Sequence, residues 1–105
     1  MKFSAVLKNF DLRCNCIEDA GATALGEALK VNAVLNTLWL MDNQIGPTGA
    51  AALADALKVN AVLNKLILRG NNIGDAGAAA LGEGLKVNAA LKKKSGAREL
   101  YFILK

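Results

Sequence analysis

The sequence has little of what catalysis requires. Its 105 residues include no histidine, so the most common general base and zinc ligand is missing. The two serines, Ser4 and Ser95, lie near the ends of the sequence, and neither has an evident base beside it. The carboxylates fall at expected helix starts or on helix faces, where a solvated role is the default. We therefore expect no enzyme, no catalytic residue, no cofactor and no metal ion.

Cysteines and long hydrophobic runs are also scarce. Cys14 and Cys16 are too few and too close for a disulfide framework, and they favour a reducing compartment. The apolar run near Met1 is too short for a signal peptide. No stretch approaches the roughly 20 apolar residues of a transmembrane helix. The sequence thus indicates a cytoplasmic protein with no membrane contact.

The excess of positive charge is confined to one end. Residues 1–90 hold eight Lys or Arg and eight Asp or Glu, so the net charge of +4 comes from residues 91–105. A short basic tail is typical of a solubilising end. The alternative is nucleic-acid binding through Lys92, Lys93 and Lys94, but three lysines offer few phosphate contacts. We expect no nucleic-acid partner.

What the sequence does contain is a repeat. Residues 7–34, 35–62 and 63–90 form three consecutive 28-residue units, and the second and third are identical at 17 of 28 positions. Such self-similarity predicts a solenoid in which each unit buries one face against its neighbour. Solenoids tolerate a core of small side chains, which agrees with the many alanines and the five aromatic residues.

Each unit has two halves with different periodicity. Around Leu38 and Leu40 apolar residues alternate, as in a short strand with one buried face, and Asn43 follows where its amide can bond unpaired backbone groups. The second half has helical spacing. Pro47 is expected in the first turn of its helix, and Asp19 and Asp75 occupy the same position in the other two units, where the helix dipole favours an anion. Helix ends are expected at positions that recur in every unit, with lysine in the last turn and asparagine as a left-handed stop: Lys30, Lys58, Lys86, Asn32, Asn60 and Asn88.

The motif Leu-x-x-Leu-x-Leu-x-x-Asn-x-Ile-Gly-x-x-Gly, best seen from Leu35 to Gly49, resembles the ribonuclease-inhibitor type of leucine-rich repeat. That type also occurs in NOD-like receptors and Ran GTPase-activating proteins. The resemblance covers residues 7–90 and implies a right-handed α/β solenoid, with a short parallel sheet on the concave side and helices on the convex side. Residues 1–6 match the end of a preceding repeat, so the sequence begins inside a coil. Residues 91–105 form a basic, then apolar tail.

The outward strand positions are the candidate binding surface, because they differ from unit to unit whereas the inward ones repeat. Trp39 lies between two inward leucines, and alternation points it away from the core. We expect Trp39, Met41 and Ile67 to form an exposed apolar spot beside Arg13 and Arg69. Tryptophan and arginine are enriched among residues that dominate binding energy. The full predicted partner-binding set is Trp39, Met41, Ile67, Arg13, Arg69, Asp11, Lys65 and Thr37.

These features predict a protein-interaction module that binds a protein partner through its concave strand face. The alternative is a purely structural piece of a longer solenoid with no specific partner.

The tail leaves two interpretations open. The segment 100–104 either adds a displaced fourth strand, with Leu100, Phe102 and Leu104 inward, or pairs with another copy of the chain, since open repeat ends and unpaired edges favour self-association.

Overall fold

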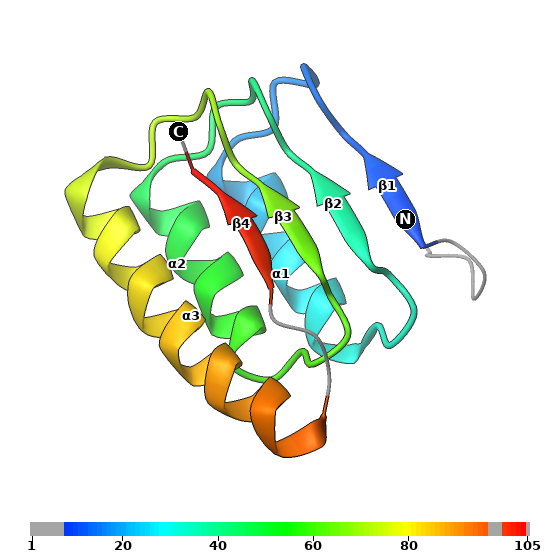
Figure 1. Ribbon diagram of the computed structural model, residues 1–105. Helices are drawn as coiled ribbons and strands as arrows, with labels where there is room; N and C mark the ends of the chain where they lie inside the picture. The colour runs from blue at the N-terminus through cyan, green and yellow to red at the C-terminus, as the bar shows by residue number, and fades with distance from the viewer. Residues whose placement is uncertain (1–7, 97–99, 105) are drawn as a thin grey trace.

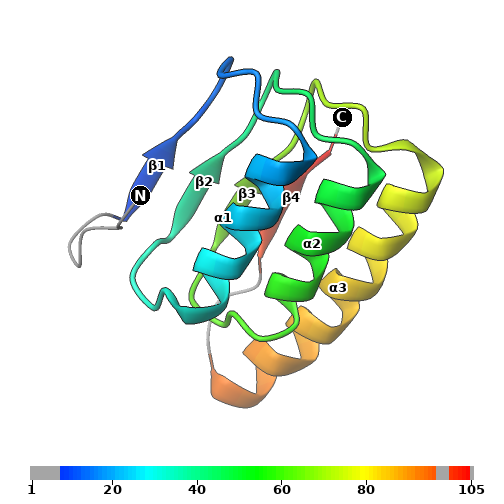
Figure 2. The ribbon, with the colours of Figure 1, turned by 180° about the vertical axis from the view of Figure 1, so that it is seen from behind.

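The chain coils three times into a strand–helix solenoid. The computed structural model describes residues 8–96 and 100–104, apart from the side chains of Ser95 and Ile103. The strands are β1 (Asn9–Asp11), β2 (Thr37–Trp39), β3 (Lys65–Ile67) and β4 (Tyr101–Ile103), and the helices are α1 (Asp19–Val31), α2 (Pro47–Leu57) and α3 (Gly74–Ser95). The sheet is parallel in the order β1-β2-β3-β4, and all three helices cover one of its faces (Figures 1 and 2). The predicted right-handed α/β solenoid is confirmed.

The core is a stack of equivalent side chains, one from each coil. The middle residues of the four strands are in register: Phe10, Leu38, Leu66 and Phe102. Leu38 and Leu66 are fully buried, and the two phenylalanines are partly buried against the same core. The inward positions therefore repeat because each one packs against its own copy in the next coil.

Small residues let neighbouring helices approach closely. A Cβ added at Gly26 of α1 would lie 2.8 Å from the backbone oxygen of Ala52, and one at Gly84 of α3 would lie 2.8 Å from that of Ala54. Both distances are too short for a carbon–oxygen contact, so each glycine is required by the separation of the helices. The alanine-rich composition thus reflects the narrow space between helices.

Asparagine side chains join each coil to the next. Asn43 is buried; its Oδ1 accepts the backbone N–H groups of Asn15 and Ile17 at 2.9 and 3.0 Å, and its Nδ2 donates to the carbonyls of Leu12 and Leu40 at 3.0 and 3.1 Å. Asn71 repeats this arrangement one coil later, accepting from Ile45 and donating to Leu40 and Leu68. The backbone groups left free at the ends of the strands are thereby satisfied.

A second asparagine ladder lies near the C-terminal ends of α1 and α2, at the opposite edge of the solenoid from Asn43 and Asn71. Asn60 donates to the carbonyls of Leu29 and Asn32 in the preceding coil and accepts the N–H groups of Val62 and Leu63. The predicted left-handed stops at these positions are wrong. Asn32 is extended (φ −82°, ψ 126°), Asn60 is not among the residues with positive φ, and Asn88 lies inside α3. Bonding between coils, rather than backbone handedness, explains the repeated asparagine.

The third repeat departs from the other two. Strands β1, β2 and β3 begin 28 residues apart, but β4 begins 36 residues after β3, because α3 has 22 residues whereas α1 and α2 have 13 and 11. Lys86 consequently lies well inside α3 instead of in a last turn, and Lys58 is the cap that follows α2. β4 pairs with β3, and Leu100, Phe102 and Leu104 pack against the core.

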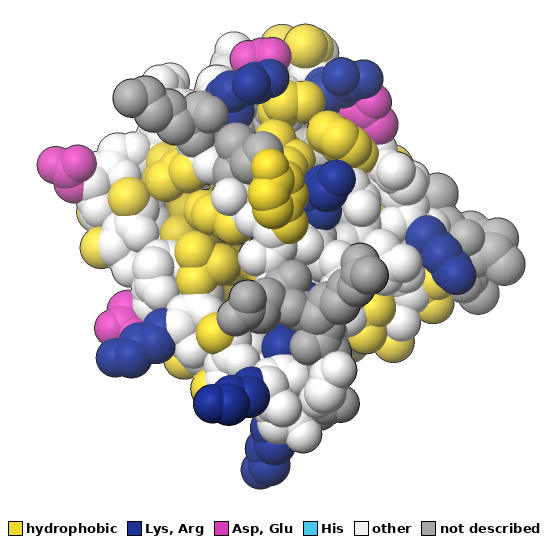
Figure 3. All heavy atoms as spheres, in the orientation of Figure 1, with side chains coloured by type: hydrophobic (Ala, Val, Ile, Leu, Met, Phe, Trp, Pro, Cys, Tyr) yellow, Lys and Arg dark blue, Asp and Glu magenta, His cyan; other side chains and the backbone are white. Residues whose placement is uncertain are grey.

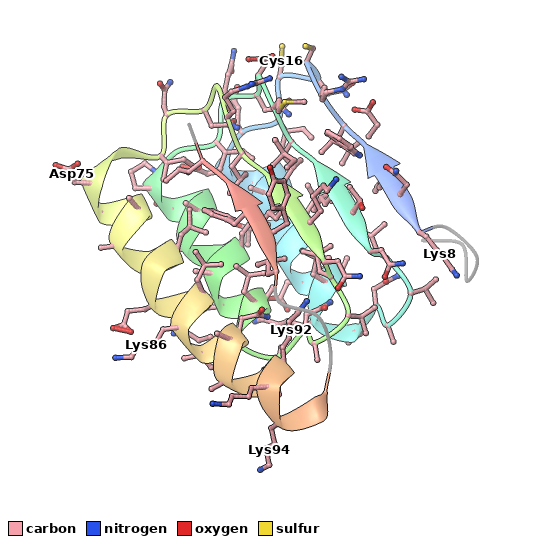
Figure 4. The ribbon with its side chains drawn as sticks, viewed as in Figure 1. Lys8, Cys16, Asp75, Lys86, Lys92 and Lys94 are labelled. Atoms are coloured by element: carbon pink, nitrogen blue, oxygen red, sulfur yellow. The ribbon has the colours of Figure 1, made fainter. Side chains whose placement is uncertain are left out.

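The extra turns of α3 carry a buried cation. Lys92 is fully buried, and its Nζ donates to the carbonyl of Leu63 and, at 3.3 Å, to Oδ1 of Asn64. Burial lowers the pKa of Lys92 from its usual value. Lys92 points from α3 toward the sheet, while Lys86 and Lys94 point away (Figure 4). The prediction that Lys92 belongs to a solubilising basic tail is therefore wrong, because Lys92 lies in α3 and is part of the core.

Because Asn43 bonds two coils together, its removal should destabilise the chain more than removal of Asn15, the equivalent residue of the first repeat. Asn43→Ala should lower the free energy of unfolding by about 2–4 kcal/mol, because several buried backbone groups lose their partner. Asn15→Ala is the matched control: Asn15 is exposed, and its Nδ2 donates to the Arg13 carbonyl within its own loop. It should cost at most about 0.5 kcal/mol. Urea unfolding followed by circular dichroism measures both, and equal losses would contradict the ladder.

Asp19 provides a second matched pair. Its Oδ1 accepts the backbone N–H groups of Gly46 and Gly49, at 2.6 and 3.0 Å, and so caps the start of α2 from the preceding coil. Asp75 has the same place on α3 but lies exposed at the end of the helix layer. Asp19→Ala should destabilise the chain by about 1–2 kcal/mol and Asp75→Ala by far less, as measured by urea unfolding. A larger effect at Asp75 would show that the cap does not act between coils.

Candidate functional site

The outer surface of the sheet, called here the strand face, is the side turned away from the helices. Register places its side chains in rows across the sheet. Asn9, Thr37, Lys65 and Tyr101 form the first row, and Asp11, Trp39 and Ile67 are in register in the next. Figure 3 shows this face, with Lys and Arg side chains lying beside hydrophobic ones over β2 and β3.

Trp39 is the centre of the strand face. Its indole Nε1 donates to Oδ1 of Asn9 at 2.7 Å, which fixes the ring diagonally across the two strands. The Arg13 guanidinium lies 5.8 Å from the ring centroid and the Lys65 Nζ lies 5.7 Å from it. These distances are typical of cation–π contacts. Trp39 is partly buried, and its polar and cationic neighbours hold the ring in one orientation.

Tyr101 extends this cluster and was not among the predicted site residues. The Lys65 Nζ lies 5.4 Å from the Tyr101 ring centroid, so the ammonium group is close to two aromatic rings. Tyr101 is 56% exposed. The alternation that places Leu100, Phe102 and Leu104 inward also turns Tyr101 outward, so the signal was present in the sequence. It could be read only once β4 was known to join the sheet beside β3.

The predicted apolar spot is wrong for two of its three members. Ile67 is 3% exposed and Met41 is 7% exposed, so both are buried. Ile67 lies between β2 and β4, paired with Trp39 on one side and with Ile103 on the other. Met41 is contacted by Arg69, whose Nη2 donates to its Sδ at 3.3 Å. Alternation gives the direction of these two side chains but not their burial within the assembled sheet.

A shallow hollow lies where the strands end, next to Trp39. It is lined by six residues: Asp11, Arg13, Cys14, Met41, Asp42 and Arg69. Arg13 and Asp11 form an ion pair with Nη2 and Oδ2 2.7 Å apart, and Arg13 Nε also donates to Oδ1 at 2.9 Å. Hydrogen bonds from the Arg13 side chain and backbone hold the pKa of Asp11 below its ordinary value of 3.8. The hollow therefore contains one self-neutralised pair, with Asp42 and Arg69 beside it.

The cysteines occupy the loops that follow the strand ends. Both are exposed and neither forms a disulfide. Cys14 has φ 57°, as does its counterpart Asp42, and the third counterpart is Gly70 at 79°. Over residues 8–96 and 100–104, no group of three or more His, Cys, Asp or Glu side chains could hold a metal ion. In the same ranges, no helix combines the length and hydrophobicity needed to span a bilayer.

Short parallel strands alternate with helices in successive coils, which is the architecture of a strand–helix repeat protein. Comparison with known families makes this specific. The sequence model described as Leucine Rich repeat matches residues 4–26, 31–54 and 59–82, more than half of the sequence. The chain belongs to the leucine-rich repeat family.

Solved structures supply a further likeness. The fold is similar to that of the structure of Leiomodin-1 Actin-Binding Site 2, with a TM-score of 0.76 and 27% sequence identity. The match covers 95% of this chain and 56% of the leiomodin chain, so the present chain spans little more than half of that relative. A comparison with curated proteins found no match.

The ion pair in the hollow leads to a prediction about protonation. Arg13→Gln removes the guanidinium and should raise the pKa of Asp11 toward 3.8, with the backbone N–H bond from position 13 keeping part of the shift. The pKa is measured by NMR titration of the carboxyl carbon. Lys30→Gln, which removes an equal charge on a helix, should leave it unchanged. A pKa of Asp11 that stays low in Arg13→Gln would rule out the pair as its cause.

Proposed function

We propose that this chain is a protein-interaction module that binds its partner through the strand face. The observation that carries the proposal is the Trp39 ring, which is partly buried, held by Asn9 and placed beside the cations of Arg13 and Lys65. A rigid aromatic ring costs little entropy to bury, and tryptophan and arginine dominate many interfaces. Tyr101, which is exposed, adds a second ring beside Lys65.

Two further lines support a binding role over catalysis. The sequence has no histidine, and the carboxylate best placed on the strand face, Asp11, is engaged by Arg13. The leiomodin relative is named as an actin-binding site, which makes a protein partner the natural class to test. The 28-residue period supports the ribonuclease-inhibitor type within the family. Two free, exposed cysteines fit a reducing compartment such as the cytoplasm.

One observation favours the alternative, a structural segment of a longer solenoid or a self-associating unit. Between α3 and β4 a hollow is lined by Leu85, Asn88, Ala89, Leu100 and Phe102, and hydrophobic side chains are visible there in Figure 3. The Oδ1 of Asn88 is buried and has no hydrogen-bond partner among the described residues. Its counterpart on Asn60 accepts the backbone N–H groups of Val62 and Leu63 in its own coil, whereas the residues that follow Asn88 continue α3, so the hollow rather than this atom is what supports the alternative. This end of the solenoid could receive another coil.

The strand-face proposal is tested by Trp39→Ala. Partner binding should fall by more than about tenfold, while the circular dichroism spectrum is retained, because the ring lies on the surface of the sheet. Glu83→Ala, an exposed change on α3, is the matched control and should keep full binding. Immobilised wild type and variants are compared first with monomeric actin, then with a protein mixture analysed by mass spectrometry. Equal retention of every partner by Trp39→Ala would favour the structural alternative.

A further inference from the structure

Two cations on and just beyond β3, Lys65 and Arg69, form no ion pair within residues 8–96 and 100–104. Arg13, Lys30 and Lys58 each pair with a nearby carboxylate, at 2.7, 3.0 and 3.6 Å. In the same part of the chain, Lys65 instead contacts aromatic rings and Arg69 contacts the Met41 sulfur. The positive charge of the strand face is therefore uncompensated on this strand.

The Lys65 ammonium is held in place without being neutralised. Its Nζ lies 5.7 Å from the Trp39 ring centroid and 5.4 Å from that of Tyr101, and the side chain is only partly exposed. Ring faces attract the cation but do not satisfy its three N–H donors. A carboxylate that approached Lys65 would meet a pre-positioned donor, and less side-chain entropy would be lost than at a free lysine.

Arg69 offers a comparable group at the hollow. It is exposed, and the contact of its Nη2 with Met41 Sδ engages a weak acceptor only. The remaining guanidinium N–H groups suit a carboxylate oxygen pair. Lys65 begins β3 and Arg69 lies in the turn just after it, four residues later, so their Cα atoms are at most about 13 Å apart. Carboxylates with the same separation on an extended peptide would reach both.

We propose that the strand face recognises an acidic, extended polypeptide segment, with one carboxylate at Lys65 and a second at Arg69. This inference rests on the proposed function and specifies the chemistry of its partner. Trp39 and Tyr101 flank the first contact and exclude water from it. The hollow beside Trp39 receives the second contact.

A peptide fits this surface better than a nucleic acid does. Asp42 and the Asp11–Arg13 pair line the same hollow as Arg69. A nucleic acid carries phosphates so closely spaced that some would lie against these carboxylates. An acidic peptide can place its two charges selectively and set neutral residues opposite Asp42. The spacing of the charges, rather than their total number, therefore decides binding.

The test uses three capped nine-residue peptides made of threonine and serine apart from two positions. The first has Glu at positions 3 and 7, the second has Gln at both, and the third has Glu at positions 3 and 4. Binding to the full chain is followed at low salt by NMR, using the Trp39 indole N–H resonance and the backbone amides. The double variant Lys65→Gln with Arg69→Gln is compared with Lys30→Gln with Lys58→Gln, which removes the same charge from the helix side.

The first peptide should shift the indole resonance and the amides of Lys65 and Arg69. Its dissociation constant should be lower than those of the other two peptides and should rise about tenfold in the strand-face double variant, but not in the helix-side one. Equal binding of the Gln peptide, equal loss in both double variants, or tighter binding of a nine-nucleotide single-stranded DNA would overturn the proposal. If Trp39→Ala loses its protein partner while the strand-face double variant keeps it, the interaction function stands and the acidic specificity fails.

Discussion

The structure depends on hydrogen bonds that side-chain amides make to the backbone of a neighbouring coil. A coil that leaves its sheet to enter a loop exposes N–H and C=O groups that no strand or helix pairs, and burying them unpaired would be costly. Asn43 and Asn71 bond these groups at one end of the strands, and Asn60 does so at the other. The repeat length is fixed because each amide must reach the same groups one coil away.

The sequence was sufficient to predict the repeating architecture but not the structure of residues 91–105. A period of 28 residues determines which side chains stack, so the buried row through Leu38 and Leu66 could be predicted without coordinates. The path beyond residue 90 could not be, because nothing in the repeat states that α3 continues through Asn88 or that Lys92 enters the core. Those outcomes depend on local helix propensity and on hydrogen bonds to Leu63 and Asn64, which belong to another coil.

The candidate site, like the fold, could be predicted from the sequence only in part. Alternation correctly turned Trp39 and Lys65 outward, because side-chain direction on a strand is a local property. Exposure is not local: Ile67 is buried on a strand that is paired on both sides, and Met41 is buried and contacted by Arg69. Tyr101 could not be assigned to the site from the sequence, because its position depends on the pairing of β4 with β3, which are far apart in the sequence. The direction of each side chain could be predicted from the alternating pattern. Which side chains lie next to one another on the surface could be known only from the assembled sheet.

The lengthened α3 changes what the solenoid can accommodate. Three coils related by one translation could in principle be extended by a fourth identical coil, yet β4 reaches the sheet eight residues later than that translation requires, as the spacings of 28 and 36 show. Inserting another 28-residue unit after β3 would preserve the asparagine ladders, while inserting one after α3 would interrupt them at Asn88. Engineers who wish to lengthen or shorten this repeat array should therefore add or remove units before α3, and should keep α3 and β4 together.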